Sequence, residues 1–310
     1  MVKSRRRSAA TWAVKQALMF SQITPLRGRG GYAAVRAGSA GNTVRFPQAV
    51  AEAALFEDFF QFFRPFDVKK ALVGKDVLDF GSGYGGRTLE YARRFGPRFV
   101  WGVEPFENVI ALSRQYAAQE RVGNVEFLLC GHTTIPLTAE SIDVVLSYDV
   151  LEHVTDPRKS LDEIWRVLRP GGLAFLVFPV YFGAFSHHLD YVSLLPGLPW
   201  MFSPQTLVRA VNELLEGERG SRFGTSLQPE PALAFDGTRC VLPSLNGLGG
   251  EHLDELVRNF TVVQSHRHGW IRRRAPRSVF MKVVSALPLP VRILDAVTSS
   301  VSCILTKPSS

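Results

Sequence analysis

Short apolar runs alternate with helical patterns through the middle of the chain. Each run has the length of a buried strand, and turn-forming residues separate it from the next helical pattern. Alternation of this kind predicts right-handed crossovers and a parallel sheet that helices cover on both faces. The predicted strands are residues 76–80, 99–103, 125–130, 142–147 and 173–178. Two later runs, 260–265 and 299–305, predict strands that extend the sheet.

Two segments have the spacing of helices with one apolar face. The first predicts a helix that covers one edge of the following domain, and its apolar residues are Phe56, Phe59, Phe60 and Phe63. The second, residues 158–168, is the clearest helical pattern and ends before a Pro-Gly-Gly sequence. Its apolar stripe consists of Leu161, Ile164, Trp165 and Leu168.

The N-terminal residues differ in composition from the rest of the chain. They are rich in Arg, Gly, Ala and Ser and lack a sustained apolar period, which predicts a basic, mostly disordered arm. A short basic amphipathic helix over residues 11–20 is compatible with this pattern. The predicted organisation is an arm over 1–45 and one domain over 46–310, with a core at 70–180, an insertion at 181–250 and C-terminal strands at 260–306.

The composition is that of an ordinary globular protein, with 46% hydrophobic and 21% charged residues. The net charge of +8 is concentrated in the N-terminal arm and in residues 272–282. The three cysteines lie far apart, which argues against a disulfide framework and fits a reducing cytoplasm. The longest apolar run, 173–185, is too short to cross a bilayer. The Arg-rich start also resembles an organelle transit peptide.

A glycine-rich turn follows the first predicted strand. Gly81, Gly83 and Gly86 stand between an apolar strand and a helical pattern. Glycine there allows the backbone to approach a nucleotide-like ligand, and a tight turn can demand a positive φ. Taken alone, this spacing is also typical of strand-to-helix turns that bind no ligand.

Two acidic residues add information to the glycine turn. Asp79 stands just before the first glycine, and Glu104 ends the second predicted strand, where it can accept hydrogen bonds from ribose hydroxyls. An acid beside the turn repels the pyrophosphate of a dinucleotide but attracts the amino group and sulfonium of S-adenosylmethionine. This favours S-adenosylmethionine over NAD. The alternatives are a helix cap for Asp79 and a solvated acid for Glu104.

Five ordered segments resemble the class I S-adenosylmethionine-dependent methyltransferases, especially the group that includes small-molecule and quinone methyltransferases. They are residues 79–85, 103–104, 142–147, 151–154 and 168–172. The resemblance implies an α/β, Rossmann-like three-layer sandwich. Its sheet is mostly parallel and seven-stranded, with one antiparallel strand near the C-terminus. The implied cofactor is S-adenosyl-L-methionine.

The resemblance also implies a set of cofactor-binding residues. They are Asp79, Gly81, Ser82, Gly83, Gly85, Glu104, Pro105, His132 and Tyr148. His132 stands where the family commonly carries an acid that binds the adenine amino group. A neutral imidazole can still accept one hydrogen bond, and an ordinary polar loop histidine is the alternative.

A methyl acceptor that is protonated at neutral pH requires a general base. His187 and His188 follow the fifth predicted strand and are favoured over His153, which follows the fourth. Adjacent histidines cannot easily bind one ion together, and no third ligand has suitable spacing, so no metal is expected. The apolar residues within 182–202 predict a lid over the acceptor, with ordinary packing of an insertion as the alternative.

These patterns together predict a cytoplasmic methyltransferase with a small, partly hydrophobic acceptor, such as a lipid, quinone, polyketide or lipid-linked sugar. The basic segments suggest peripheral contact with an anionic membrane. Methylation of RNA or protein is the alternative that the basic arm raises, but residues 147–149 lack the motif of amino-methylating nucleic-acid enzymes. A non-catalytic scaffold and an NAD-dependent oxidoreductase are further alternatives.

Overall fold

The computed structural model describes residues 2–21, 46–131, 133–186, 193–215, 245–269, 281 and 286–309. The chain forms two compact units. The first comprises Met1–Thr43, Val180–Gly249 and Gly269–Ser299, and the second comprises Val44–Pro179, Gly250–His268 and Ser300–Ser310.

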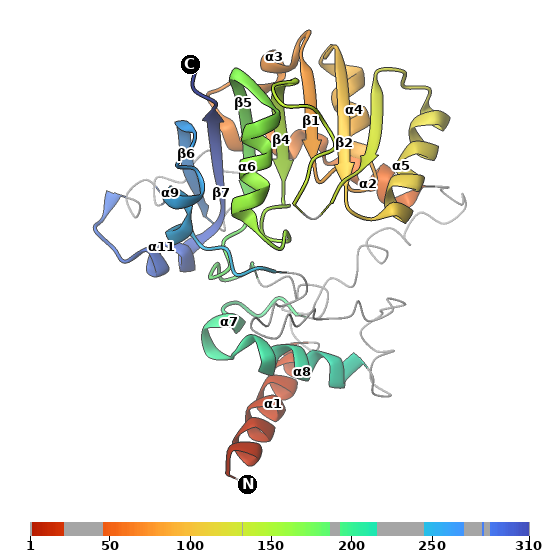
Figure 1. Ribbon diagram of the computed structural model, residues 1–310. Helices are drawn as coiled ribbons and strands as arrows, with labels where there is room; N and C mark the ends of the chain where they lie inside the picture. The colour runs from red at the N-terminus through yellow and green to blue at the C-terminus, as the bar shows by residue number, and fades with distance from the viewer. Residues whose placement is uncertain are drawn as a thin grey trace. The chain divides into compact units, whose positions relative to one another are not determined.

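A seven-stranded sheet forms the centre of the fold, with the strand order β3-β2-β1-β4-β5-β7-β6 (Figure 1). Its strands are β1 (Asp76–Phe80), β2 (Phe99–Glu104), β3 (Val125–Leu129), β4 (Ile142–Tyr148), β5 (Leu168–Phe178), β6 (Thr261–Gly269) and β7 (Thr298–Thr306). β1 to β5 pair in parallel, whereas β5 and β7 run antiparallel. The predicted α/β, Rossmann-like fold is therefore confirmed, including the antiparallel pairing near the C-terminus.

Helices follow β1, β2 and β4 along the chain, as right-handed crossovers require. The helices of the second unit are α2 (Pro47–Ala54), η2 (Phe56–Phe63), α3 (Val68–Leu72), α4 (Gly86–Arg94), α5 (Glu107–Glu120), α6 (Pro157–Val167), η4 (Gly250–His252) and α9 (Leu253–Leu256). Figure 1 shows α6 in front of β4 and β5. The capping carboxylate of Asp156 begins α6 by accepting a hydrogen bond from Lys159 N at 3.1 Å.

Parallel pairing brings the carboxyl ends of neighbouring strands to one edge of the sheet. Phe80 at the end of β1 pairs with Val103, and Tyr148 at the end of β4 pairs with Val177. The loops that follow β1, β2 and β4 consequently begin at the same edge, which is where open α/β sheets bind ligands.

The opposite, amino edge of the sheet carries a cluster of ion pairs. Asp76, which is 4% exposed, accepts hydrogen bonds from Arg98 Nε at 2.6 Å and from Arg169 Nη2 at 3.1 Å. Arg169 Nη1 also lies 2.9 Å from Asp143 Oδ2. The same Asp143 oxygen accepts a hydrogen bond from Asp76 N at 2.9 Å. These contacts join the starts of β1, β4 and β5.

The phenylalanine-rich segment forms a 3-10 helix, η2, rather than the α-helix that its spacing predicts. A 3-10 helix has about three residues per turn, so Phe62 and Phe63 both turn inward with Phe59 and Phe60. The ring of Phe63 packs edge-on against Phe175 of β5, with centroids 5.3 Å apart. Packing of these rings on the sheet overrides the local preference for an α-helix.

The helix predicted over 158–168 is confirmed as α6, which ends one residue earlier. Leu161 and Ile164 are buried, but Trp165 is 36% exposed and therefore does not belong to the buried stripe. The ammonium nitrogen of Lys307 lies 4.1 Å from the centroid of the Trp165 ring. The Trp165 Nε1 donates a hydrogen bond to Asn259 O at 3.2 Å. β5 begins at Leu168, earlier than predicted, because the Pro-Gly-Gly sequence is part of the strand.

The described residues of the first unit include the helices α1 (Val2–Ser21), α7 (Leu198–Met201), α8 (Pro204–Leu215) and α11 (Val291–Val297). α1 differs from the mostly disordered arm predicted for this segment, because Val14 and Leu18 are buried against Leu207 and Val211 of α8. Residues 22–45 lie outside the described residues. The predicted domain boundaries stay predictions.

Candidate functional site

The glycine turn connects β1 to α4 at the carboxyl edge of the sheet. Gly81, Gly83 and Gly85 have φ values of 80°, 54° and 82°, a region that strongly favours glycine. Gly81 N and Ser82 N both donate hydrogen bonds to Val103 O, at 3.0 Å. The turn is thus anchored on the end of β2. A positive φ is found at Gly81 and Gly83 of the predicted motif but not at its third glycine, Gly86, which begins α4.

Asp79 lies near the end of β1, just before the turn, and is 5% exposed. Thr88 Oγ1, on the first turns of α4, donates a hydrogen bond to Asp79 Oδ2 at 2.6 Å. Burial raises the pKa of Asp79, and the Thr88 hydrogen bond and the charge of Arg87 oppose that rise. Asp79 is therefore a buried acid whose nearest hydrogen-bond donor is a neutral hydroxyl.

Glu104 ends β2 and faces the same turn. Its Oε2 accepts a hydrogen bond from Gly83 N at 3.3 Å. Burial raises the pKa of Glu104 to about 7, the hydrogen bond from Gly83 lowers it, and the charges of Glu52 and Asp79 raise it further. A carboxyl group with this pKa is partly protonated at neutral pH, so a ligand that requires the carboxylate form competes with a proton.

Glu52 of α2 belongs to this cluster although the sequence analysis did not identify it. Its Oε1 accepts a hydrogen bond from Tyr84 N, and its Oε2 accepts one from Gly86 N, both at 3.0 Å. Burial raises the pKa of Glu52, and the charge of Arg87 opposes the rise. In the sequence Glu52 is an isolated acid among alanines, far from the turn, so no local pattern indicates this contact.

Arg87 is a cation at the start of α4 that the sequence analysis also missed. Its guanidinium lies over the ring of Tyr148 at the end of β4, 4.9 Å from the ring centroid. Burial lowers the pKa of Arg87, but the neighbouring groups, Glu52 and Asp79 among them, raise it above its ordinary value. Arg87 thus offsets part of the negative charge around the turn, and Tyr148 is held by this cation and by the Phe59 ring, 5.7 Å away.

A second acidic group follows β4. Glu152 is 3% exposed, and within the described residues neither of its carboxyl oxygens has a hydrogen-bond partner. His153 Nε2 lies 3.6 Å from Glu152 Oε1. Burial raises the pKa of Glu152 well above its ordinary value, and the charge of Asp149 adds to the rise. Both causes favour the neutral form of the Glu152 carboxyl group.

The remaining predicted site residues have different outcomes. Ser82 is 2% exposed, and its Oγ has no hydrogen-bond partner within the described residues. Pro105 directly follows β2 at the same edge. His132, His187 and His188 lie outside the described residues. The assignment of cofactor-binding and catalytic residues stays a prediction.

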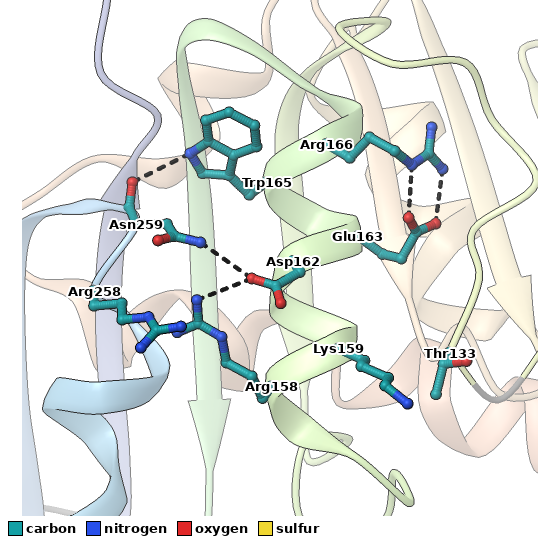
Figure 2. A pocket seen from close by; sticks show the side chains of 9 residues that line it. All are labelled: Thr133, Arg158, Lys159, Asp162, Glu163, Trp165, Arg166, Arg258 and Asn259. Carbon is teal, nitrogen blue, oxygen red and sulfur yellow. Dashed lines mark hydrogen bonds and ion pairs between the residues drawn. The ribbon is translucent and has the colours of Figure 1, made fainter.

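A separate open groove of about 600 Å³ lies along α6 (Figure 2). Its charged side chains are largely paired with one another. Arg158 Nη2 lies 3.2 Å from Asp162 Oδ1, and Arg166 Nε lies 2.6 Å from Glu163 Oε1. None of the predicted site residues lines this groove.

Within the parts of the chain that the structure describes, no group of three or more His, Cys, Asp or Glu side chains is arranged to hold a metal ion. Among the same residues, no helix combines the length and the hydropathy needed to cross a bilayer.

Comparison with known proteins gives a family match over the centre of the chain. Residues 78–176 match the family described as methyltransferase domain. An uncharacterized methyltransferase of Mycobacterium sp. (strain JLS) is 38% identical over 115 residues, which are 37% of this chain and 43% of the relative. An arsenite methyltransferase of Halobacterium salinarum is 37% identical over 100 residues, 32% of this chain and 26% of the relative. The chain therefore spans less than half the length of these curated relatives.

Among solved structures, an S-adenosylmethionine-dependent methyltransferase from Methanosarcina mazei is 17% identical and has a TM-score of 0.48, covering 80% of this chain and 99% of that chain. The matched segment of the family includes the glycine turn, Glu104 and the residues after β4, but it excludes α2 and therefore Glu52.

Proposed function

We propose that the chain is a class I S-adenosylmethionine-dependent methyltransferase that uses the methyltransferase domain matched over residues 78–176 to methylate a small, partly hydrophobic acceptor. The acceptor classes that we consider are a lipid, a quinone, a polyketide and a lipid-linked sugar.

The observation that carries the proposal is the charge around the glycine turn. Glu52, Asp79 and Glu104 surround it, and their pKa values are raised by burial. Arg87 is the cation that faces them. Such an excess of acids disfavours the pyrophosphate of a dinucleotide and favours a cationic ligand. S-adenosylmethionine supplies that positive charge, together with the methyl group that it donates when bound.

The residues of the turn fit such a cofactor. Glu104 would accept hydrogen bonds from the ribose hydroxyls, since its carboxyl group lies at the end of β2 beside the turn. Gly81 to Gly85 would lie against the amino acid part of the cofactor. The buried Ser82 Oγ, which has no hydrogen-bond partner within the described residues, supplies a further polar atom beside the turn. Asp79 would add negative charge for the cofactor's amino group.

The apolar character of the acceptor rests on the segment after β5. Phe185, Trp200 and Met201 are 44%, 48% and 63% exposed. Trp200 Nε1 donates a hydrogen bond to Phe182 O at 2.8 Å, which joins two of the described residues of the segment. Exposed apolar side chains on a folded segment are typical of surfaces that bind apolar ligands or partners. We propose that this segment contacts the acceptor.

We retain His187 or His188 as the proposed general base for a hydroxyl acceptor, ahead of His153. An apolar surrounding lowers the pKa of an imidazole and keeps it able to accept a proton near pH 7. His153 is the alternative because it adjoins the buried Glu152. Contact of the basic segments with an anionic membrane is a further part of the proposal.

Cofactor binding is tested first. We test S-adenosylmethionine, S-adenosylhomocysteine and NAD by calorimetry and by thermal shift. Only the first two ligands should bind the chain and raise its melting temperature, because a ligand that binds the folded state raises its stability. Stabilisation by NAD alone would replace the proposal with an oxidoreductase. Absence of binding by all three would favour a non-catalytic scaffold.

Acceptor methylation is tested next, with labelled S-adenosylmethionine and panels of quinones, lipids, RNA and protein. We expect label in an apolar small molecule. Once an acceptor is found, replacing His187 and His188 by Ala together should lower turnover and leave the affinity for S-adenosylhomocysteine nearly unchanged. Full activity of the double variant would reject both histidines as the base, and label in RNA or protein would reject the proposed acceptor class.

A further inference from the structure

The backbones of α2 and α4 approach each other more closely than a side chain at the point of contact, Gly86, would allow. A Cβ atom added at Gly86 would lie 1.9 Å from Ala49 O and 2.7 Å from Ala53 N, both in α2. Only glycine permits such an approach between two backbones. Gly86, the last glycine of the predicted motif, therefore serves the docking of α2.

This docking places the Glu52 carboxylate on the glycine turn. Its two oxygens accept hydrogen bonds from Tyr84 N and Gly86 N, both at 3.0 Å. These donors lie where α4 begins, and the first amides of a helix have no partner within the helix. A carboxylate there is also favoured by the helix dipole. Glu52 thus satisfies two amides of the turn from a different element.

Gly83 lies between Glu52 and Glu104. A Cβ atom added at Gly83 would lie 2.6 Å from Glu52 Oε1, and Gly83 N donates to Glu104 Oε2 at 3.3 Å. On the other side, Ser113 Oγ donates a hydrogen bond to Gly83 O at 3.1 Å. Gly83 is therefore hydrogen-bonded to side chains of β2 and α5, and the Glu52 carboxylate of α2 occupies the space that a side chain at Gly83 would need.

We propose that Glu52 is a positioning residue that holds the glycine turn in the shape required to bind the cofactor. The proposal rests on the proposed function, and it extends the cofactor site to α2, which lies outside the matched segment 78–176. Glu52 acts through Gly83 and its neighbours and through the charge that it presents to Glu104, without itself contacting the reacting atoms.

The competing explanation is that Glu52 only caps the start of α4. The two explanations differ in whether the charge of Glu52 affects ligand binding. Glu104 faces the charges of Glu52 and Asp79 and itself raises the pKa of the Cys130 thiol. Arg87 faces Glu52 and Asp79. Removing the charge of Glu52 removes one cause of the raised pKa of Glu104. The pH at which ligand binding is half-maximal should then move to a lower value, which loss of a structural cap alone would not produce.

The experiment measures the dissociation constant of S-adenosylhomocysteine by calorimetry between pH 6 and pH 9 for the full chain. Glu52→Gln keeps the shape but places an amide N–H group against one backbone donor. We expect binding to weaken about tenfold, the loss of one hydrogen bond to a charged group. We also expect a lower midpoint of the pH dependence. Glu52→Asp keeps the charge but shortens the reach, so it should weaken binding and leave the midpoint near that of the parent chain.

Glu57→Gln is the matched control, because the Glu57 side chain is 65% exposed and pairs with Lys69 at 3.0 Å. It should bind S-adenosylhomocysteine within about twofold of the parent chain, as expected for a surface substitution. Unchanged affinity and midpoint in both Glu52 variants would overturn the proposal, as would a lower melting temperature with unchanged binding. If Glu52→Gln does not fold, the affinity of Glu52→Asp is decisive. Weaker binding of S-adenosylhomocysteine by Glu52→Asp would support the proposal, and unchanged binding would overturn it. Absence of binding by the parent chain would instead reject the proposed function.

Discussion

The two ends of strand β1 carry buried aspartates in opposite surroundings. Asp76 at the amino edge is bonded by the guanidinium groups of Arg98 and Arg169. Asp79, further along the same strand, has the neutral hydroxyl of Thr88 as its hydrogen-bond donor. Both side chains are almost fully buried, at 4% and 5% exposure. The two aspartates are thus buried to the same extent, and among the described residues only Asp76 has cationic side chains as direct hydrogen-bond partners.

The difference indicates two uses of buried charge. At the amino edge, arginines neutralise the carboxylates and connect the starts of three strands. At the carboxyl edge, burial raises the pKa values of four acids, namely Glu52, Asp79, Glu104 and Glu152. The carboxylate forms of these acids therefore cost the folded chain free energy. A cationic ligand bound there would offset that cost. Raised pKa values of this kind gather at functional sites.

The largest expected effect is at Glu104. Glu104→Ala should weaken binding of S-adenosylhomocysteine by about 1–3 kcal/mol, because it removes a charge-assisted hydrogen-bond acceptor for the ribose. Calorimetry measures this change. Unchanged affinity would mean that the ribose lies elsewhere.

The same residue should have the opposite effect on the stability of the ligand-free chain. The pKa of Glu104 rises from 4.5 to about 7 on folding, so the folded state binds the proton more tightly than the unfolded state and stability falls as pH rises through that window. Glu104→Gln should therefore be as stable as the parent chain at pH 4 and more stable above pH 7, as measured by urea unfolding. If Glu104→Gln were less stable than the parent chain above pH 7, the Glu104 carboxylate would stabilise the fold, as we infer for Asp76.

At the amino edge, Asp76→Asn should lower the free energy of unfolding by about 1–2 kcal/mol. The change removes the charge that two arginines bind, and those arginines are themselves partly exposed, which limits the loss. Urea unfolding measures the effect. Affinity for S-adenosylhomocysteine should stay unchanged, and a large change in affinity would erase the distinction between the two edges.

Ligand binding should also depend on pH. If the ribose requires the carboxylate of Glu104, affinity for S-adenosylhomocysteine should rise with pH up to about 7 and then level off. Below that pH the loss approaches about tenfold per unit for a single group, or ~1.4 kcal/mol. A flat profile between pH 5.5 and pH 8 would show that the ionisation of Glu104 is not linked to binding.

The smallest effect is expected at Glu152. Burial and the charge of Asp149 raise the pKa of Glu152 and so favour its neutral form, which Glu152→Gln would replace by another neutral group of similar shape. Its free energy of unfolding at pH 7 should lie within about 0.5 kcal/mol of the parent chain. The comparison with Asp76→Asn is direct, because both variants convert a buried acid to its amide. An equal loss in both would mean that Glu152 is ionised.

Local patterns in the sequence predicted most of the sheet. β1 was predicted with the bounds that the structure has, and the other strands differ by one to a few residues at their ends. The turn with Gly81 and Gly83 and the acid at Glu104 were also identified, because strands, tight turns and strand ends leave signals within a few neighbouring residues. The sequence did not predict that the phenylalanine segment is a 3-10 helix or that Trp165 is exposed. Both features depend on which other elements pack against these residues.

The amino-acid sequence by itself determined the alternating α/β order, the glycine turn and the acids near the ends of β1 and β2. Only the tertiary structure decided which charges meet. Arg98 and Arg169 reach Asp76, and Glu52 reaches the amides of the turn, from elements distant along the chain. The physical reason is that strand order and helix docking fix these distances, and no periodicity within one segment records them. Whether a buried acid is neutralised by the protein or left for a ligand is therefore a property of the folded chain.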